Sequence, residues 1–210
     1  ANSLKIENCL MRRGVVAALT DPEYGSTTKP YIAHSIPGTI PAAYYDIGAR
    51  GLSYNDSDYW NDGDGGYNDG WVFRNDGVDV EASDNLNIPY TVGWTEAGEW
   101  LGYTIEDVSP GTYNVIFNVS APSSGGIFFA QLSGQNLGVI DVPATGGWYN
   151  WEPLNGQTVT INEGEKFLKI IIVQAGFNIQ SVTFDPVLNI GNQRLNPEKF
   201  LLGKPYPNPF

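Results

Sequence analysis

The chain has 210 residues and a formal net charge of −12, from 23 acidic and 11 basic side chains. Binding to nucleic acid or to an anionic membrane surface needs a basic face, so this balance argues against both partners. Only 16% of the residues are charged, whereas glycine, proline and tyrosine are frequent, which is typical of turn-rich β proteins rather than helical ones.

Residues 1–35 are expected to be a linker or the end of a preceding domain. The segment "DPEYGSTTKPY", residues 21–31, is polar and interrupted by proline and glycine. The stretch before it allows one or two strands. Cys9 is the only cysteine, so the sequence predicts neither a disulfide framework nor a thiolate metal site.

From residue 36 onward, short runs rich in valine, isoleucine, tyrosine, phenylalanine and threonine alternate with turn residues. The run "GTYNVIFNVSA" has period two, with Tyr113, Val115, Phe117 and Val119 on one face. "EKFLKIIIVQ" is expected to be a central strand covered on both faces. The candidate strands are 40–46, 71–74, 77–82, 88–94, 99–106, 111–121, 127–133, 137–141, 148–152, 157–162, 165–174 and 178–185.

This spacing of strands, without a convincing amphipathic helix, predicts an all-β fold: a β-sandwich of jelly-roll type with two antiparallel sheets over residues 36–186. After Pro186 the hydrophobic density falls and prolines become frequent. We expect residues 187–210 to be a linker and tail.

Few residues suit catalysis. His34 is the single histidine and lies in a linker-like context, so no nucleophilic triad is expected. Glu96 and Glu99, in "WTEAGEW", are the one carboxylate pair that suits glycoside cleavage. Because they flank a turn, their side chains should diverge, and a structural role is favoured.

The acidic loop "YNDSDYWNDGDGGYNDG", residues 54–70, suggests a calcium-binding site. Neither counting frame, from Asp56 or from Asp62, closes with a glutamate at position 12, so an EF-hand is excluded. An irregular site built from Asp56, Asp58, Asp62 and Asp64 and a solvated turn-forming loop both stay open.

Two tryptophans stand beside turns: Trp94 in "TVGWTEAG" and Trp148 after Gly146 and Gly147. Loops run over the surface, so these rings present flat apolar faces that either bind a ligand or close the end of the sandwich. A pyranose offers a matching C–H face, while its hydroxyls need polar partners such as Asn178 and Glu96. Trp71, Trp100 and Trp151 lie inside strand-like runs and are expected to pack in the core.

Several motifs together resemble a family 6 carbohydrate-binding module. They are "IPGTI", "YYDIG", "GLSYNDSD", "DGVDVE", "VGWTEAGEWLGYTI", "PGTYNVIFNVSA", "VPATGGWYNW" and "GFNIQSVTF", in the family's order over about residues 36–186. The resemblance implies a non-catalytic sandwich that tethers a secreted glycoside hydrolase to polysaccharide. It places two aromatic rings and an asparagine at one end of the sandwich, here Trp94, Trp148 and Asn178. Glu96 and Tyr54 complete the candidate ligand-binding set.

The family also opens its first strand with a Glu-Ala-Glu pattern that helps to hold a structural calcium ion. Pro41 and Ala43 stand in those places here, and Asp185 keeps one ligand. Calcium takes six to eight oxygen ligands, so we expect the site to be weak or absent and predict no cofactor.

The tail "FLLGKPYPNPF" resembles the start of a type IX secretion sorting domain, which implies a secreted or cell-surface protein. The resemblance to family 6 implies a module that binds xylan, β-glucan or agarose, with a catalytic domain upstream, and we expect it to be monomeric. Two alternatives are an enzyme using Glu96 and Glu99, and a spacer or adhesive domain whose tryptophans close the sandwich.

Overall fold

The structure is a computed structural model that describes residues 11–57, 73–74 and 76–188. Its helices are α1 (Arg13–Thr20) and a 3-10 helix (Ala42–Tyr44). Its strands are β1 (Ser35–Ile36), β2 (Gly38–Pro41), β3 (Tyr54–Asn55), β4 (Val80–Ala82), β5 (Tyr90–Val92), β6 (Trp100–Ile105), β7 (Asp107–Val108), β8 (Gly111–Ala121), β9 (Gly126–Leu132), β10 (Gln135–Val142), β11 (Gly147–Ile161), β12 (Lys166–Gln174) and β13 (Asn178–Pro186).

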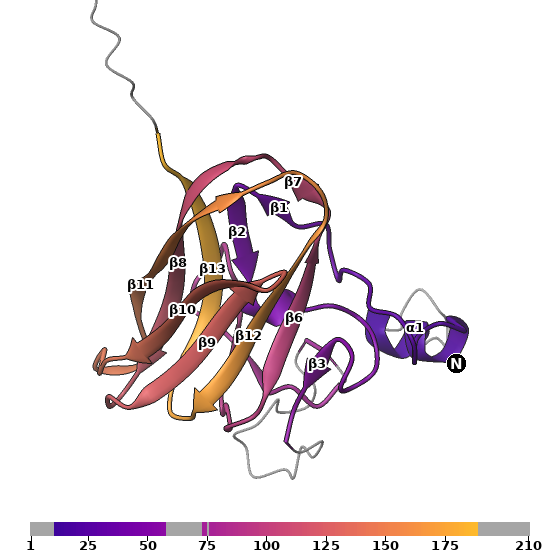
Figure 1. Cartoon of the computed structure of the whole chain (residues 1–210). Coiled ribbons are helices and arrows are strands. Elements are labelled where there is room, and N and C mark those ends of the chain that lie inside the picture. The colour runs from indigo at the N-terminus through magenta and orange to yellow at the C-terminus, as the bar shows by residue number, and fades with distance from the viewer. Residues whose placement is uncertain (1–10, 58–72, 75, 189–210) are drawn as a thin grey trace, which may run out of the picture.

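Two antiparallel sheets form the body of the molecule and confirm the predicted β-sandwich (Figure 1). One sheet has the order β10-β9-β12-β6-β3. The other has the order β11-β8-β13-β5-β4, with β2 paired to β13. The only parallel pairing among the described strands joins β1 and β7. Among the same residues, no helix is long and apolar enough to cross a membrane.

The alternating pattern of β8 follows from its position between the core and the outer surface. Tyr113, Val115, Phe117 and Val119 are buried, as their period of two predicts, whereas the residues between them are more exposed. Phe117 meets Phe128 of β9 edge-to-face, with ring centroids 5.0 Å apart. Such contacts between the inner faces of the two sheets make the core.

Strand β12 is central, as predicted, because it pairs with both β9 and β6. The expectation that it is covered on both faces is wrong. Leu168, Ile170 and Ile172 are buried, whereas Lys169 and Ile171 between them are only half-buried. The strand therefore buries one face, although apolar residues such as Ile171 also occur on its other face.

Four further predicted strands differ from the structure. The runs 148–152 and 157–162 belong to one long strand, β11, whose pairing with β8 shifts register twice. The run 40–46 begins as β2 but turns into the 3-10 helix. Of the run 71–74, only residues 73–74 are described, and they are not in a strand.

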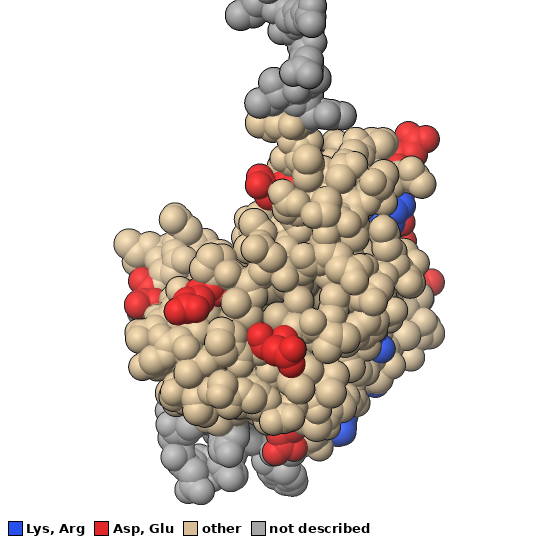
Figure 2. Space-filling view, turned by 60° about the vertical axis from the view of Figure 1, so that its left-hand side comes forward, with Lys and Arg blue, Asp and Glu red and all other residues tan. Residues whose placement is uncertain are grey.

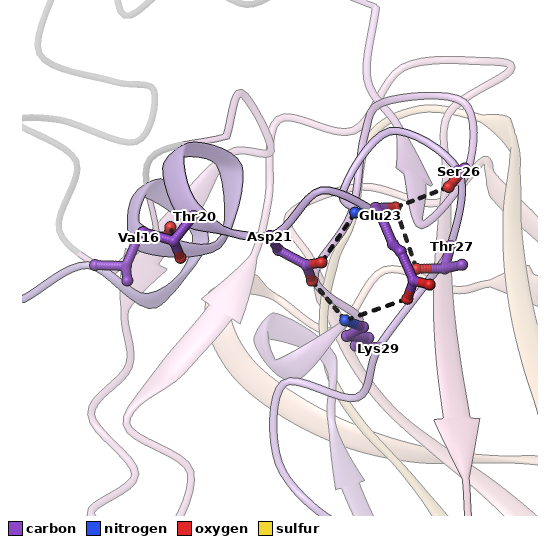
Figure 3. A network of polar contacts seen from close by, with 7 residues as sticks. All are labelled: Val16, Thr20, Asp21, Glu23, Ser26, Thr27 and Lys29. Atoms are coloured by element: carbon purple, nitrogen blue, oxygen red, sulfur yellow. Dashed lines mark hydrogen bonds and ion pairs between the residues drawn. The ribbon is translucent and has the colours of Figure 1, made fainter.

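The N-terminal segment contains a helix, where the sequence allowed one or two strands or the end of a preceding domain. Helix α1 exposes Val15, Val16 and Leu19, and none of its residues is buried. After it, a small network joins Asp21, Glu23 and Lys29 (Figure 3). Hydrogen bonding and charge from Lys29 lower the pKa of the Asp21 carboxyl, and the same bond raises the pKa of Lys29.

The same segment packs against the sandwich. The backbones of Lys29 and Ile47 exchange two hydrogen bonds, of 2.9 and 2.7 Å. Arg12 donates to the carbonyl of Phe73 across 2.7 Å, and the ring of Tyr31 lies against Phe73. Residues 11–34 are therefore attached to the sandwich at several points.

A buried polar cluster lies beside this attachment. The Arg74 guanidinium donates from Nε to Asp76 Oδ2 across 2.9 Å and from Nη2 to the Asp46 carbonyl across 3.0 Å. It also donates to the Tyr45 carbonyl, and the Tyr45 hydroxyl donates to Asp76 Oδ1. Arg74, Asp76, Tyr45 and Asp46, here called the arginine cluster, are all less than one-tenth exposed.

Four connections meet at one end of the sandwich, the lower end in Figure 1: 93–99, 122–125, 143–146 and 175–177. Backbone hydrogen bonds link them to neighbouring strands, for example Thr145 N–H to the Ala121 carbonyl and Gly98 N–H to the Ile172 carbonyl. This end carries the candidate functional site.

Candidate functional site

A cavity of about 270 Å³ opens at this end of the six-stranded sheet. It is lined by Glu81, Trp94, Trp148, Tyr149 and Asn178. Cavities for drug-sized ligands run from roughly 300 to 1,000 Å³, so this one suits a smaller unit such as a single sugar ring.

The lining residues come from four strands or their ends. Glu81 is the middle residue of β4, opposite Thr91 of β5. Trp94 follows the end of β5, Trp148 is near the start of β11, and Asn178 begins β13. The structure thus brings Trp94, Trp148 and Asn178 together, as the sequence predicts.

Trp94 adopts a backbone conformation that is unusual for its residue type. Its φ is 43°, in the left-handed region, which costs a bulky residue about 1–3 kcal/mol. The surrounding contacts hold it there: Gly93 N–H donates to the Asp79 carbonyl, and the Thr95 hydroxyl donates to the Phe177 carbonyl. Backbone strain of this kind concentrates at functional sites.

Asn178 is 3% exposed, and its amide nitrogen has two partners. Nδ2 donates to Glu81 Oε1 across 3.0 Å and to the Trp148 carbonyl across 3.2 Å. Its Oδ1 lies over Gly93, where an added Cβ would be only 2.6 Å away. Both amide protons are therefore engaged, and glycine at position 93 makes room for the side chain.

Glu81 connects Asn178 to Tyr149. Its Oε2 accepts a hydrogen bond of 2.6 Å from the Tyr149 hydroxyl. Partial burial raises the pKa of Glu81, although hydrogen bonds from Tyr149 and Asn178 lower it in part. The bond to Glu81 raises the pKa of Tyr149 to about 12. None of the five lining residues is basic, so the Glu81 charge has no cationic partner within the lining.

The tryptophans differ in exposure. Trp148 is 46% exposed, which matches the expectation for a ring held beside a loop. Trp94 is half-buried. The prediction that Trp151 packs in the core is wrong: it is only partly buried, and its indole N–H lies 3.4 Å from an Asp84 carboxylate oxygen. The cause is the register break between Gly147 and Glu152, which takes residues 148–151 out of the ladder with β8.

Trp100 and Trp71 were also expected in the core. Trp100 is half-buried in β6, and the Lys169 ammonium lies 3.7 Å from its ring centroid. Trp71 lies outside the described residues.

Glu96 and Glu99 do not line the cavity. Glu99 accepts hydrogen bonds from the backbone N–H groups of Ser57 (3.0 Å) and Glu96 (2.7 Å). Glu96 is exposed and accepts from the Ser57 hydroxyl across 2.6 Å. Both carboxylates thus brace the turn at 95–98 against Ser57.

Two other predicted positions have a different environment from the one expected. Tyr54 is 3% exposed in β3 of the other sheet, with its ring 5.4 Å from that of Tyr45, so it packs in the core and does not line the cavity. His34 is not in an open linker but is 4% exposed, and burial lowers its pKa. Its Nε2 lies 3.1 Å from the Tyr44 carbonyl.

The residues at the expected calcium position do not fit that ion. Pro41 and Ala43 offer no side-chain oxygen, Ala43 is fully buried, and Asp185 is exposed near the end of β13. Among the described residues, no three acidic, histidine or cysteine side chains are grouped to hold a metal. Asp56 is described and 4% exposed. Asp58, Asp62 and Asp64 lie outside the described residues, so the prediction for that loop stays a prediction.

Sequence reasoning missed two lining residues, Glu81 and Tyr149. Glu81 ends the motif "DGVDVE", and alternation within β4 gives no sign that it reaches Asn178. Tyr149 follows Trp148 directly. A second aromatic residue beside a loop tryptophan was a usable signal, but its partner Glu81 is 68 residues away in the sequence.

Comparison with known proteins places this chain among carbohydrate-binding modules. Residues 74–184 match the family model described as carbohydrate binding module (family 35). The C-terminal CBM6 of LamC, a marine laminarinase from Zobellia galactanivorans, is 26% identical and has a TM-score of 0.52; the match covers 70% of this chain and 98% of that one. The module CBM6cm-2 of Cellvibrio mixtus lichenase 5A, in complex with cellotriose, has the same fold at 22% identity and a TM-score of 0.51; that match covers 72% and 98%.

A curated relative is the clotting factor G alpha subunit of Tachypleus tridentatus, 28% identical over 139 residues. The match covers 64% of this chain and 20% of that protein, so the chain spans about a fifth of its length. The resemblance to family 6 is confirmed for the class of module and for the fold, whereas the matching family model is that of family 35. That model spans more than half of the 210 residues, and the chain therefore belongs to the carbohydrate-binding modules of family 35.

Proposed function

We propose that the cavity binds one sugar unit of a β-linked polysaccharide, with Trp94 and Trp148 as the aromatic clamp and Glu81 and Asn178 as the polar edge. The observation that carries the proposal is the meeting of two tryptophan rings with a carboxylate and an amide in one small cavity. The C–H face of a pyranose fits an indole ring, and its hydroxyls need hydrogen-bond partners at the edge.

The polar edge favours sugar hydroxyls as donors. Both protons of the Asn178 amide are engaged, so this residue offers the ligand only its oxygen. An ionised carboxylate has about four lone-pair positions, and Glu81 uses one on each oxygen. The remaining positions accept from neighbouring hydroxyls of a neutral sugar.

The surface that Figure 2 shows is compatible with binding a neutral polymer. In Figure 2, which brings the left-hand side of Figure 1 forward, acidic side chains stand in separate small groups and most of the visible surface is uncharged. With a net charge of −12, electrostatic attraction to nucleic acid is not expected.

For the ligand we propose β-glucan, xylan or agarose, with laminarin tested first because the similar module of LamC belongs to a laminarinase. We further propose that the module acts as a monomer, is secreted or held at the cell surface, and tethers a glycoside hydrolase encoded upstream. The sorting motif that motivates part of this proposal lies in the tail, outside the described residues.

Calorimetric titration with oligosaccharides of laminarin, xylan, cellulose and agarose tests the proposal. We expect Trp148→Ala to weaken binding by about 30-fold or more, equivalent to about 2 kcal/mol, the loss typical of a central aromatic contact. Because the ring is 46% exposed, the free energy of unfolding should change by less than about 2 kcal/mol, against about 3–5 for a core tryptophan.

The matched control is Trp100→Ala, which removes the same side chain from β6, outside the cavity. It should leave affinity unchanged. Unfolding of the Trp148→Ala variant would favour the alternative in which the ring closes the sandwich of a spacer domain. Release of sugar products by the isolated chain would favour the enzyme that uses Glu96 and Glu99.

A further inference from the structure

Residues 148–151 form an arch that leaves the β11–β8 ladder and reaches β4. The pairing of Gly147 with Ala121 is followed next by that of Glu152 with Val119, so the residues between them are unpaired in the ladder. β11 and β4 stand at opposite ends of the path β11-β8-β13-β5-β4 in the six-stranded sheet. The arch nevertheless bonds to Glu81 through Tyr149 and approaches Asp84 through Trp151.

Trp148 is fixed through its backbone on the inner side of the arch. Its carbonyl accepts hydrogen bonds from Asn178 Nδ2 and from the Ser120 hydroxyl. Its indole ring, by contrast, is half-exposed. The position of that ring over the cavity therefore depends on how firmly the arch is held on its other side.

Of the two outer attachments, the shorter is a charge-assisted bond. The Tyr149 hydroxyl donates to Glu81 Oε2 across 2.6 Å, and both side chains line the cavity with Trp148. Hydrogen bonds to ionised acceptors are short and stronger than neutral ones. Tyr149 is 44% exposed, so little apolar burial assists the bond.

We propose that Tyr149 is a positioning residue for ligand binding: its hydroxyl holds the arch against Glu81, so that the Trp148 ring and the free lone pairs of Glu81 face the same sugar. The inference rests on the function proposed above. The Tyr149–Glu81 bond, here called the latch, acts through the two residues that contact the ligand.

The latch raises affinity because the side chains are ordered before the sugar arrives. Immobilising a side chain on binding lowers affinity, and an arch fixed in advance avoids part of that loss. The same bond orients Oε2, whose second lone pair then accepts from a sugar hydroxyl. Loss of the latch should weaken binding by about three- to tenfold, the ordering cost of one or two side chains.

The test is Tyr149→Phe, which removes the hydroxyl and keeps the ring. Calorimetry with whichever of the four oligosaccharide series wild type binds should give the three- to tenfold weaker affinity. The matched control is Tyr90→Phe in β5, a residue that stacks on Phe73 and does not line the cavity. It should bind as wild type does.

A second measurement separates positioning from a merely structural effect. Amide hydrogen exchange over residues 147–151, measured without ligand, should be faster in Tyr149→Phe, while exchange in the core strands β8 and β12 stays the same. A double-mutant cycle with Glu81→Gln should be non-additive, because both changes weaken the same bond: a glutamine oxygen can still accept from Tyr149, but without the charge.

The outcomes distinguish the two proposals. If wild type binds a glycan and Tyr149→Phe binds it equally well, or if exchange over the arch does not change, the latch inference is overturned and the proposed function stands. If wild type binds none of the four series, the proposed function is overturned and the inference with it.

Discussion

Two tyrosine–carboxylate pairs in the described part of the chain are chemically alike and differ in what surrounds them. In the arginine cluster, the Tyr45 hydroxyl donates to Asp76; in the cavity, the Tyr149 hydroxyl donates to Glu81. Arg74 forms a salt bridge of 2.8 Å with Asp76, whereas none of the described residues that line the cavity is a cation. Tyr45 is fully buried, and Tyr149 is 44% exposed.

This difference separates a structural site from a binding site. In the arginine cluster, Arg74 neutralises the Asp76 carboxylate, and its other donors are taken up by the backbone carbonyls of Tyr45 and Asp46. The cavity carboxylate keeps unused lone pairs beside half-exposed aromatic rings. A carboxylate that is held in place but still has unoccupied lone pairs can accept hydrogen bonds from sugar hydroxyls.

The largest effect should come from breaking the buried pair. Arg74→Ala leaves Asp76 and two backbone carbonyls without their donor in a buried environment, which we expect to lower the free energy of unfolding by about 3–5 kcal/mol. Urea denaturation measures the change. Arg50→Ala, at an exposed arginine, is the control and should stay within about 0.5 kcal/mol of wild type. A loss below about 1 kcal/mol for Arg74→Ala would contradict a structural role for the cluster.

The next effect concerns the cavity alone. Gly93→Ala places a Cβ 2.6 Å from Asn178 Oδ1, which is too close, so the Asn178 side chain must shift. That shift disturbs the hydrogen bond from its amide nitrogen to Glu81. We expect affinity for the oligosaccharide to fall about tenfold, the loss typical of one misplaced polar group. Titration calorimetry measures it, with Gly25→Ala as the control because an added Cβ there meets nothing within 4 Å. Unchanged affinity would remove Asn178 from the site.

A smaller effect is expected at Glu81, where the carboxylate should lower the stability of the fold but support ligand binding. Its pKa is raised in the folded state, mainly by burial. The folded protein therefore holds this proton more tightly than the unfolded chain, and stability falls as the pH rises from the ordinary glutamate pKa through the raised one. Above that window Glu81 is ionised at some cost to the fold.

Glu81→Gln removes this cost. The variant should be no less stable than wild type at pH 7, with the difference vanishing near pH 4, while its affinity for sugar falls about tenfold through the lost carboxylate. Denaturation at both pH values and calorimetry at pH 7 check the pair of results. Clear destabilisation at pH 7 would mean that Glu81 serves the fold, as Asp76 does.

The smallest effect should come from chelation. Because Pro41 and Ala43 lack the oxygens that the family's calcium needs, EDTA should leave the melting temperature within about 1 °C. An ion at a hundredfold excess over its Kd adds about 2.7 kcal/mol, which means a shift of several degrees for a domain of this size. Such a shift would contradict the prediction, and Asp62→Asn and Asp185→Asn variants would locate the ion.

The sequence by itself determined the sandwich and three of the cavity residues. Alternation in β8 fixes which face is buried, because successive side chains of a strand point to opposite sides. Trp94 and Trp148 were identified because a large aromatic ring beside a turn has few neighbours to cover it. Asn178 followed from its place at the start of a strand and from the family resemblance.

Only the tertiary structure decided the partners of those residues. Glu81 lies 97 residues from Asn178 and 68 from Tyr149, and no local pattern encodes contacts between strands so far apart in the chain. The register break in β11 likewise placed Trp151 at the surface, although its sequence context is that of a core residue. Periodicity reports which face of a strand is apolar, whereas the order of strands and the shifts in their pairing decide which side chains meet.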